Sequence, residues 1–82
     1  MAFAPNPEQS AKLILAIFKD HNVPAEADMR WDQLRFWFLS RGGSQGNLQA
    51  GLQAALDHGL VKVEPHDMIL LTRRGFEKFE RD

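Results

Sequence analysis

The sequence predicts an α+β fold with a core of three helices, a two-stranded β-hairpin and a C-terminal helix. Three observations indicate it. Residues 44–58 carry apolar side chains at a helical spacing. Two short apolar runs, residues 60–64 and 68–71, flank a segment of turn-forming residues. A final stretch follows Thr72, which is a good helix cap. Few small folds place a hairpin directly after an amphipathic helix.

The bulk composition is that of one small domain. The chain has 82 residues, which leave little room for a second domain. A chain of this size buries only roughly 60% of its unfolded surface, so its core needs large side chains. Six Phe and two Trp supply them. Charge is nearly balanced, with 10 basic and 11 acidic residues, whereas a nucleic-acid-binding domain usually has a basic face.

The first residues predict a flexible arm and then a helix. Prolines flank Asn6, so residues 1–7 are expected to form a flexible N-terminal arm ahead of a domain at 8–82. Asn6 also suits a helix N-cap, and the helix is expected from residue 7 or 8 to residue 21. Ala11 and Leu15 lie beside its core stripe. Either neighbouring elements cover these two residues, or they form a dimer contact.

Residues 22–28 are expected to form a loop because Pro24 stops a continuing helix. A second helix is predicted at 31–40, ending at the glycines of residues 42–43, although its apolar run also resembles a buried strand. Phe36 projects opposite to the core face of this helix. It either packs against the arm or the first helix, or it is an exposed anchor for a protein partner.

The third helix is predicted to begin after Ser44 as N-cap and to end at Gly59. A helical projection places three small residues near the centre of its outward face: Gly46, Ala50 and Ala54. Amide side chains border them, and the face has no Lys or Arg. Gly51 lies on the inner side, where we expect close approach to the aromatic side chains of the second helix.

Two segments resemble the winged helix-turn-helix superfamily, as found in bacterial regulators. They are Leu56-Asp57-His58-Gly59-Leu60-Val61 and Leu71-Thr72-Arg73-Arg74-Gly75. The first resembles the step from a recognition helix into the wing, and the second resembles the start of the helix after the wing. The likeness covers most of residues 8–80. It implies a small DNA-binding transcription regulator that acts as a dimer, with residues 44–58 as its recognition helix.

Under this interpretation the partner is double-stranded DNA, and candidate contacts fall into two groups. Base edges or the groove would be met by Ser44, Gln45, Asn47, Gln49, Ala50 and Gln53. Phosphates would be met by Arg41, Arg73 and Arg74, with Arg30 and Arg35 also available. The predicted hairpin tip departs from this pattern, because Glu64 and Asp67 would repel a phosphate backbone.

The alternative is a winged-helix protein-interaction module with little or no DNA binding. Small residues four apart allow another helix to pack closely, and exposed aromatic side chains can anchor a partner. The candidate residues are Phe36, Gly46, Ala50, Ala54, Ala11 and Leu15.

Enzymatic function is not expected. The three histidines lack zinc-ligand spacing, and the chain has no cysteine, so neither a metal site nor a disulfide framework is predicted. No phosphate-binding loop and no cofactor motif is evident. Without a signal segment or an apolar run of about 20 residues, we expect a cytoplasmic protein with no membrane association.

Overall fold

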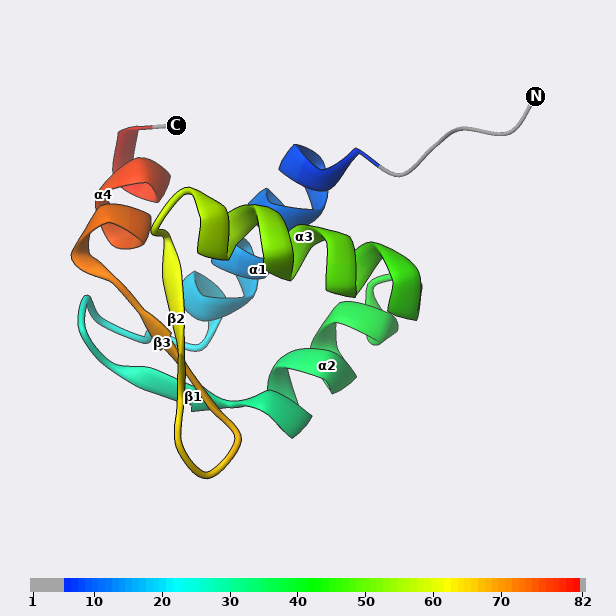
Figure 1. Cartoon of the computed structure of the whole chain (residues 1–82), viewed down its shortest axis with the longest axis horizontal. Coiled ribbons are helices and arrows are strands. Elements are labelled where there is room, and N and C mark those ends of the chain that lie inside the picture. The colour runs from blue at the N-terminus through cyan, green and yellow to red at the C-terminus, as the bar shows by residue number, and fades with distance from the viewer. Residues whose placement is uncertain (1–5, 82) are drawn as a thin grey trace.

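The computed structural model describes residues 6–81, with side chains through residue 78. It is an α+β fold, and its elements are α1 (Pro7–Asp20), β1 (Asp28–Arg30), α2 (Trp31–Ser40), α3 (Gln45–Asp57), β2 (Val61–Glu64), β3 (Met68–Leu71) and α4 (Arg73–Arg81). Helix α3 lies across α1, with α2 beside them, and the strands overlap on the other side below α4 (Figure 1).

The predicted helix caps are confirmed. The Asn6 side chain accepts a hydrogen bond from the Glu8 N–H at 3.0 Å, and Pro7 is the first residue of α1. The predicted arm at 1–7 therefore overlaps the helix, and its residues 1–5 lie outside the described residues. The Ser44 hydroxyl accepts from the Asn47 N–H at 3.1 Å. At the end of α3, Gly59 adopts a φ of +70°, a left-handed conformation that glycine favours.

The sheet corrects the prediction of a two-stranded hairpin. It has three antiparallel strands in the order β1-β3-β2, so β3 lies in the centre. Strand β1 begins at Asp28, which corrects the expectation that residues 22–28 form a loop. Its burial alternates, with only Met29 buried, but three residues are too few for an alternating pattern to be recognised in the sequence. The predicted turn between β2 and β3 is confirmed, with positive φ at His66 and Asp67.

The core decides between the two alternatives for α1, in favour of coverage by neighbouring elements, and corrects one expectation about α3. Ala11 and Leu15 are 5% and 3% exposed, because α3 packs against α1, so they are not an outward surface. Gly51 approaches α1 rather than the aromatic side chains of α2: a Cβ there would lie 2.5 Å from the Ser10 Cβ and 2.8 Å from the Ser10 carbonyl carbon. A glycine therefore allows the two helices to cross closely.

The predicted apolar face of α3 is confirmed, although its residues are buried to different extents. Leu48 and Ala55 are fully buried, while Leu52 and Leu56 are half-buried against the core. The largest fully buried side chains come from four elements: Phe18, Phe38, Ile14, Ile17, Leu34, Leu48 and Val61. Among residues 6–81, no helix combines the length and apolar composition that crossing a membrane requires.

Thr72 connects the end of α3, the start of β2 and the first turn of α4. Its hydroxyl oxygen lies 2.7 Å and 2.9 Å from the carbonyl oxygens of Gly59 and Leu60, and it accepts a hydrogen bond from the Gly75 N–H at 3.0 Å. The predicted cap at Thr72 is therefore confirmed. Gly75 packs against the Leu60 backbone so closely that an added Cβ would overlap the Leu60 carbonyl oxygen.

Candidate nucleic-acid interface

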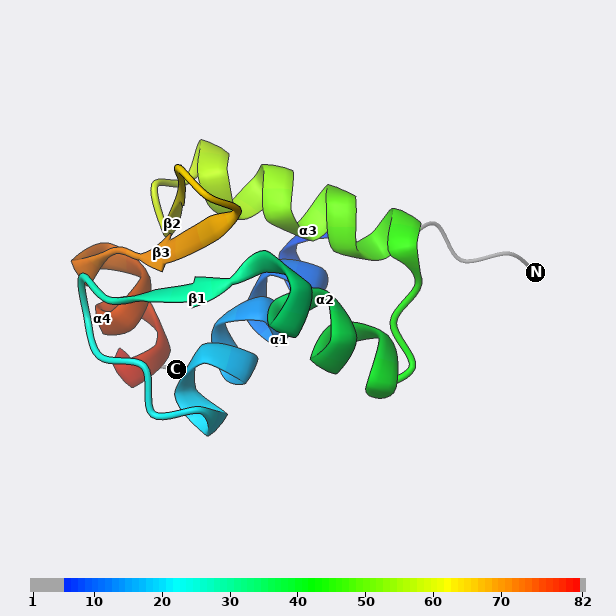
Figure 2. The same ribbon diagram turned by 90° about the horizontal axis from the view of Figure 1, so that it is seen from below.

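The outward face of α3 is the surface on which sequence reasoning placed base contacts. Helix α3 and the β2–β3 hairpin lie along the same side of the molecule (Figure 2). Four polar or small residues are exposed on the helix: Gln45, Gly46, Gln49 and Gln53. Asn47 and Ala50 are half-buried. The structure therefore exposes three of the predicted base contacts along α3: Gln45, Gln49 and Gln53.

The amides of this face are partly engaged within the chain. Gln53 Nε2 donates to Asp57 Oδ1 at 2.9 Å, which brings a carboxylate next to this amide. Gln45 Oε1 accepts from Arg35 Nε at 3.1 Å. Ser44 acts as the N-cap of α3, so its hydroxyl has a structural role at the start of the helix. Gln49 is exposed between these two ends.

The predicted row of small residues is not one outward stripe. Gly46 is exposed, but Ala54 is half-buried against the core. Ala54 lines an open groove of about 590 Å³ between α1, the end of α3 and α4, with Ala11 and Leu15 on the opposite wall. The three residues therefore do not form a flat surface on which a partner helix could pack.

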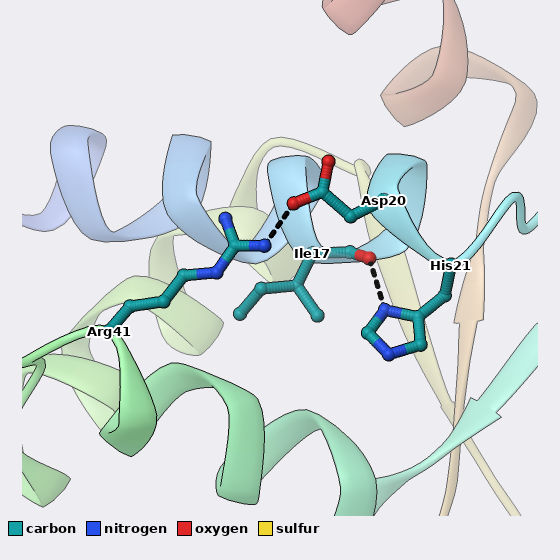
Figure 3. A network of polar contacts seen from close by, with 4 residues as sticks. All are labelled: Ile17, Asp20, His21 and Arg41. Atoms are coloured by element: carbon teal, nitrogen blue, oxygen red, sulfur yellow. Dashed lines mark hydrogen bonds and ion pairs between the residues drawn. The ribbon is translucent and has the colours of Figure 1, made fainter.

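Arg41, predicted to contact phosphate, forms an ion pair within the chain. It reaches from the turn after α2 to Asp20 at the end of α1 (Figure 3). The hydrogen bond from Arg41, together with its positive charge, outweighs desolvation and lowers the pKa of the Asp20 carboxyl below its usual value of 3.8. Beside this pair, His21 Nδ1 donates to the Ile17 carbonyl oxygen at 2.9 Å. Arg41 therefore joins α1 to α2.

Arg73 and Arg74 lie at the opposite end of α3 from Ser44. The Arg73 backbone N–H donates to Glu26 Oε1 at 3.3 Å. The Arg74 side chain passes within 3.8 Å of the Cβ position at Gly59, where the carbonyl end of α3 favours a cation. The three predicted phosphate contacts therefore do not surround the face of α3.

Arg35 is a cation that the structure places in contact with the first residue of α3. Its hydrogen bond to Gln45 links the two helices, and its side chain is exposed. Sequence reasoning named Arg35 only as an available cation, because a contact ten residues apart across a turn leaves no local pattern. The hairpin tip keeps the acidic character predicted for it, with Asp67 exposed.

A second accessible feature lies on α2. Phe36 is 61% exposed, which favours the exposed alternative for this residue over packing inside the chain. Its ring meets that of Trp37 edge to face, with centroids 5.2 Å apart, and Trp37 in turn contacts the ring of His21 at 5.2 Å. Leu39 on the same helix is 37% exposed. We call Phe36 and Trp37 the aromatic patch.

Within the described residues, no group of His, Asp and Glu side chains could hold a metal ion. Comparison with known proteins gave no match to a protein family, to a curated protein or to a solved structure.

Proposed function

We propose that this chain is a winged-helix domain that binds double-stranded DNA, with α3 entering the major groove. The observation that carries the proposal is the accessible amide-bearing face of α3, which follows α2 after a short turn and lies on the same side as the β2–β3 hairpin. In this arrangement α3 is the recognition helix and the hairpin is the wing. The major groove is wide enough to admit a helix.

The chemistry of the face suits base edges. Glutamine amides pair in a bidentate way with adenine, and a small residue such as Gly46 allows the helix to approach the groove floor. Gln49 and Gln53 are the strongest candidates, because both are exposed on the outward side. Arg35, beside the start of α3, is the candidate for a flanking phosphate contact.

This interface has few cations, so we expect weak and moderately salt-dependent binding. Each neutralised phosphate contributes about −0.9 to the slope of log K against log salt. With Arg35 and one or two further contacts, a single copy should show a slope of roughly −2 to −3. A dimer would double the number of contacts.

The test is fluorescence anisotropy of a labelled duplex of mixed sequence, titrated with protein at low salt. Gln49→Glu places a negative charge in the middle of the face and should weaken binding at least tenfold, because the carboxylate is repelled by DNA. Gln9→Glu makes the same change on the exposed first turn of α1 and should leave binding unchanged. Equal binding by both variants, or no binding by the unmodified chain, contradicts the proposal.

A second candidate function is protein binding through the aromatic patch. The 61% exposure of Phe36 favours it, because large aromatic side chains are among the residues that contribute most binding free energy when a partner covers them. A photo-crosslinking amino acid at position 36 should then yield one discrete adduct in the producing cell. The same amino acid at position 9 is the control. A lack of adduct at 36, or identical adducts at both positions, contradicts this function.

A further inference from the structure

The three-stranded sheet has an outer face that points away from the helices. Figure 1 views the sheet nearly edge-on, with α1, α2 and α3 on one side of it. The register places two rows of three residues on the other side. One row contains Lys62, Leu70 and Asp28, and the next contains Glu64, Met68 and Arg30. On the inner side, the alternate residues Ile69 and Met29 are buried in the core, whereas Val63, which pairs with Ile69 from the edge strand β2, is 61% exposed.

The exposure of these residues agrees with an uncovered face. Lys62, Asp28 and Arg30 are exposed, and Glu64 is half-buried. The two apolar residues of the central strand, Leu70 and Met68, are also only half-buried. The outer face is therefore a small apolar centre with a charged residue at each of its four corners.

The four charges alternate in sign. Lys62 and Asp28 occupy the two corners of one row, and Glu64 and Arg30 occupy the corners of the next. Each corner therefore has the opposite sign to both corners next to it, along the strand and across the sheet. The face has two cations and two anions, so its charges give no net electrostatic attraction for a polyanion such as DNA. Such a pattern is complementary to a rotated copy of itself.

We infer that the outer face of the sheet binds the same face of a second copy about a two-fold axis. With the axis parallel to β3, Lys62 lies over Asp28 of the partner subunit and Glu64 lies over Arg30 of the partner subunit. With the axis in the plane but perpendicular to β3, Lys62 lies over Glu64 of the partner subunit. Both arrangements place every cation opposite an anion and bring the two apolar centres together.

The area of the face sets the strength of the association. Three short strands, about 4.8 Å apart, present much less than the roughly 800 Å² per partner that stable complexes bury. We therefore expect a weak dimer, whose formation depends mainly on the complementary charges. Arg30 also lies 3.4 Å from Asp32, but both are exposed, and such surface pairs contribute little. This inference stands independently of the proposed DNA binding.

The first experiment is sedimentation equilibrium at low salt, with protein concentrations up to about 1 mM. The unmodified chain should show a monomer–dimer equilibrium that weakens as salt is raised, because exposed charges are screened. Lys62→Glu should weaken the dimer at least tenfold. Lys78→Glu changes the net charge equally at an exposed site on α4 and should leave the dimer unchanged.

The second experiment mixes variants that cannot dimerise alone. Asp28→Lys and Lys62→Glu should each be monomeric, and their equimolar mixture should dimerise if the axis is parallel to β3. If the axis is perpendicular, the mixture of Lys62→Glu with Glu64→Lys dimerises instead. Backbone amide spectra confirm that each variant is folded.

Rescue in one of the two mixtures supports the inference. A monomeric unmodified chain at 1 mM, normal dimerisation of Lys62→Glu, or rescue in neither mixture would overturn it.

Discussion

One hydroxyl group, that of Thr72, holds three elements together. It lies against the carbonyl oxygens of Gly59 and Leu60, which connect α3 to β2, and it caps α4 through the Gly75 N–H. Thr72→Val keeps the shape but leaves the buried Gly75 N–H without an acceptor. We expect it to lower the free energy of unfolding by about 2 kcal/mol in urea denaturation. Thr72→Ser keeps the hydroxyl and should retain most of the stability; an equal loss in both variants contradicts this role.

The ion pair of Asp20 and Arg41 predicts a pH effect. Because the pKa of Asp20 is lowered in the folded chain, the pair stabilises the fold above the usual pKa of 3.8, and this contribution is lost as pH falls through the folded value. Arg41→Gln should raise the pKa of Asp20 toward 3.8, as followed by NMR of the carboxyl carbon. Arg35→Gln, whose hydrogen bond goes to an amide, should leave the Asp20 pKa unaltered.

At the scale of elements, the crossing of α1 and α3 determines where the candidate recognition helix lies. Gly51 allows this crossing, so Gly51→Ala should lower the free energy of unfolding by about 1–3 kcal/mol, because the added methyl meets the α1 backbone. At Gly46 on the same helix, an added Cβ would meet only the Ser44 hydroxyl oxygen, at an ordinary contact distance of 3.9 Å, so Gly46→Ala should be neutral or stabilising by up to about 1 kcal/mol. Thermal unfolding of both variants tests this, and equal stabilities contradict the close approach.

Elements with local signals were predictable from the sequence. Helix α2 has the predicted bounds, and the caps at Asn6, Ser44 and Thr72 are confirmed, because capping depends on residues within three positions. Strand β1 was missed because its identity depends on pairing with β3, about 40 residues later. The prediction that Gly51 approaches the aromatic side chains of α2 was wrong for the same reason. A helical projection shows which side of a helix faces inward but not which element lies there.

At the scale of the whole molecule, the exposed faces were predictable only in part and the charge arrangement was not. The outward direction of Phe36 follows from helical period alone, but on α3 the projection centred the outward face on Gly46, Ala50 and Ala54, whereas Ala50 and Ala54 are half-buried and Gln49 and Gln53 are exposed. The ion pair of Arg41 joins residues 21 positions apart, and no pattern in the sequence indicates it. Similarly, the burial of Ala11 beneath α3 follows from how the helices are assembled.

A DNA-binding domain of this kind would have few cations near its interface. Its charges are spread over several faces: Arg41 lies at the α1–α2 junction, Arg74 at the end of α3 and Lys62 on the sheet. We therefore expect raising the salt concentration from about 50 mM to 200 mM to weaken binding by roughly 15- to 60-fold, less than the factor of 10³ or more typical of proteins with six or more phosphate contacts. Anisotropy titrations at both salt concentrations measure the ratio. A loss of 10³ or more would mean that other cations carry the binding.

The most direct test of the DNA-binding proposal is an NMR titration of the ¹⁵N-labelled chain with duplex DNA at low salt. The account predicts that the largest chemical-shift changes fall on residues 45–53 of α3 and on the Arg35 side-chain N–H, and that they fade at higher salt. Shifts confined to α4 or α1, or a spectrum that DNA leaves unchanged, would contradict it.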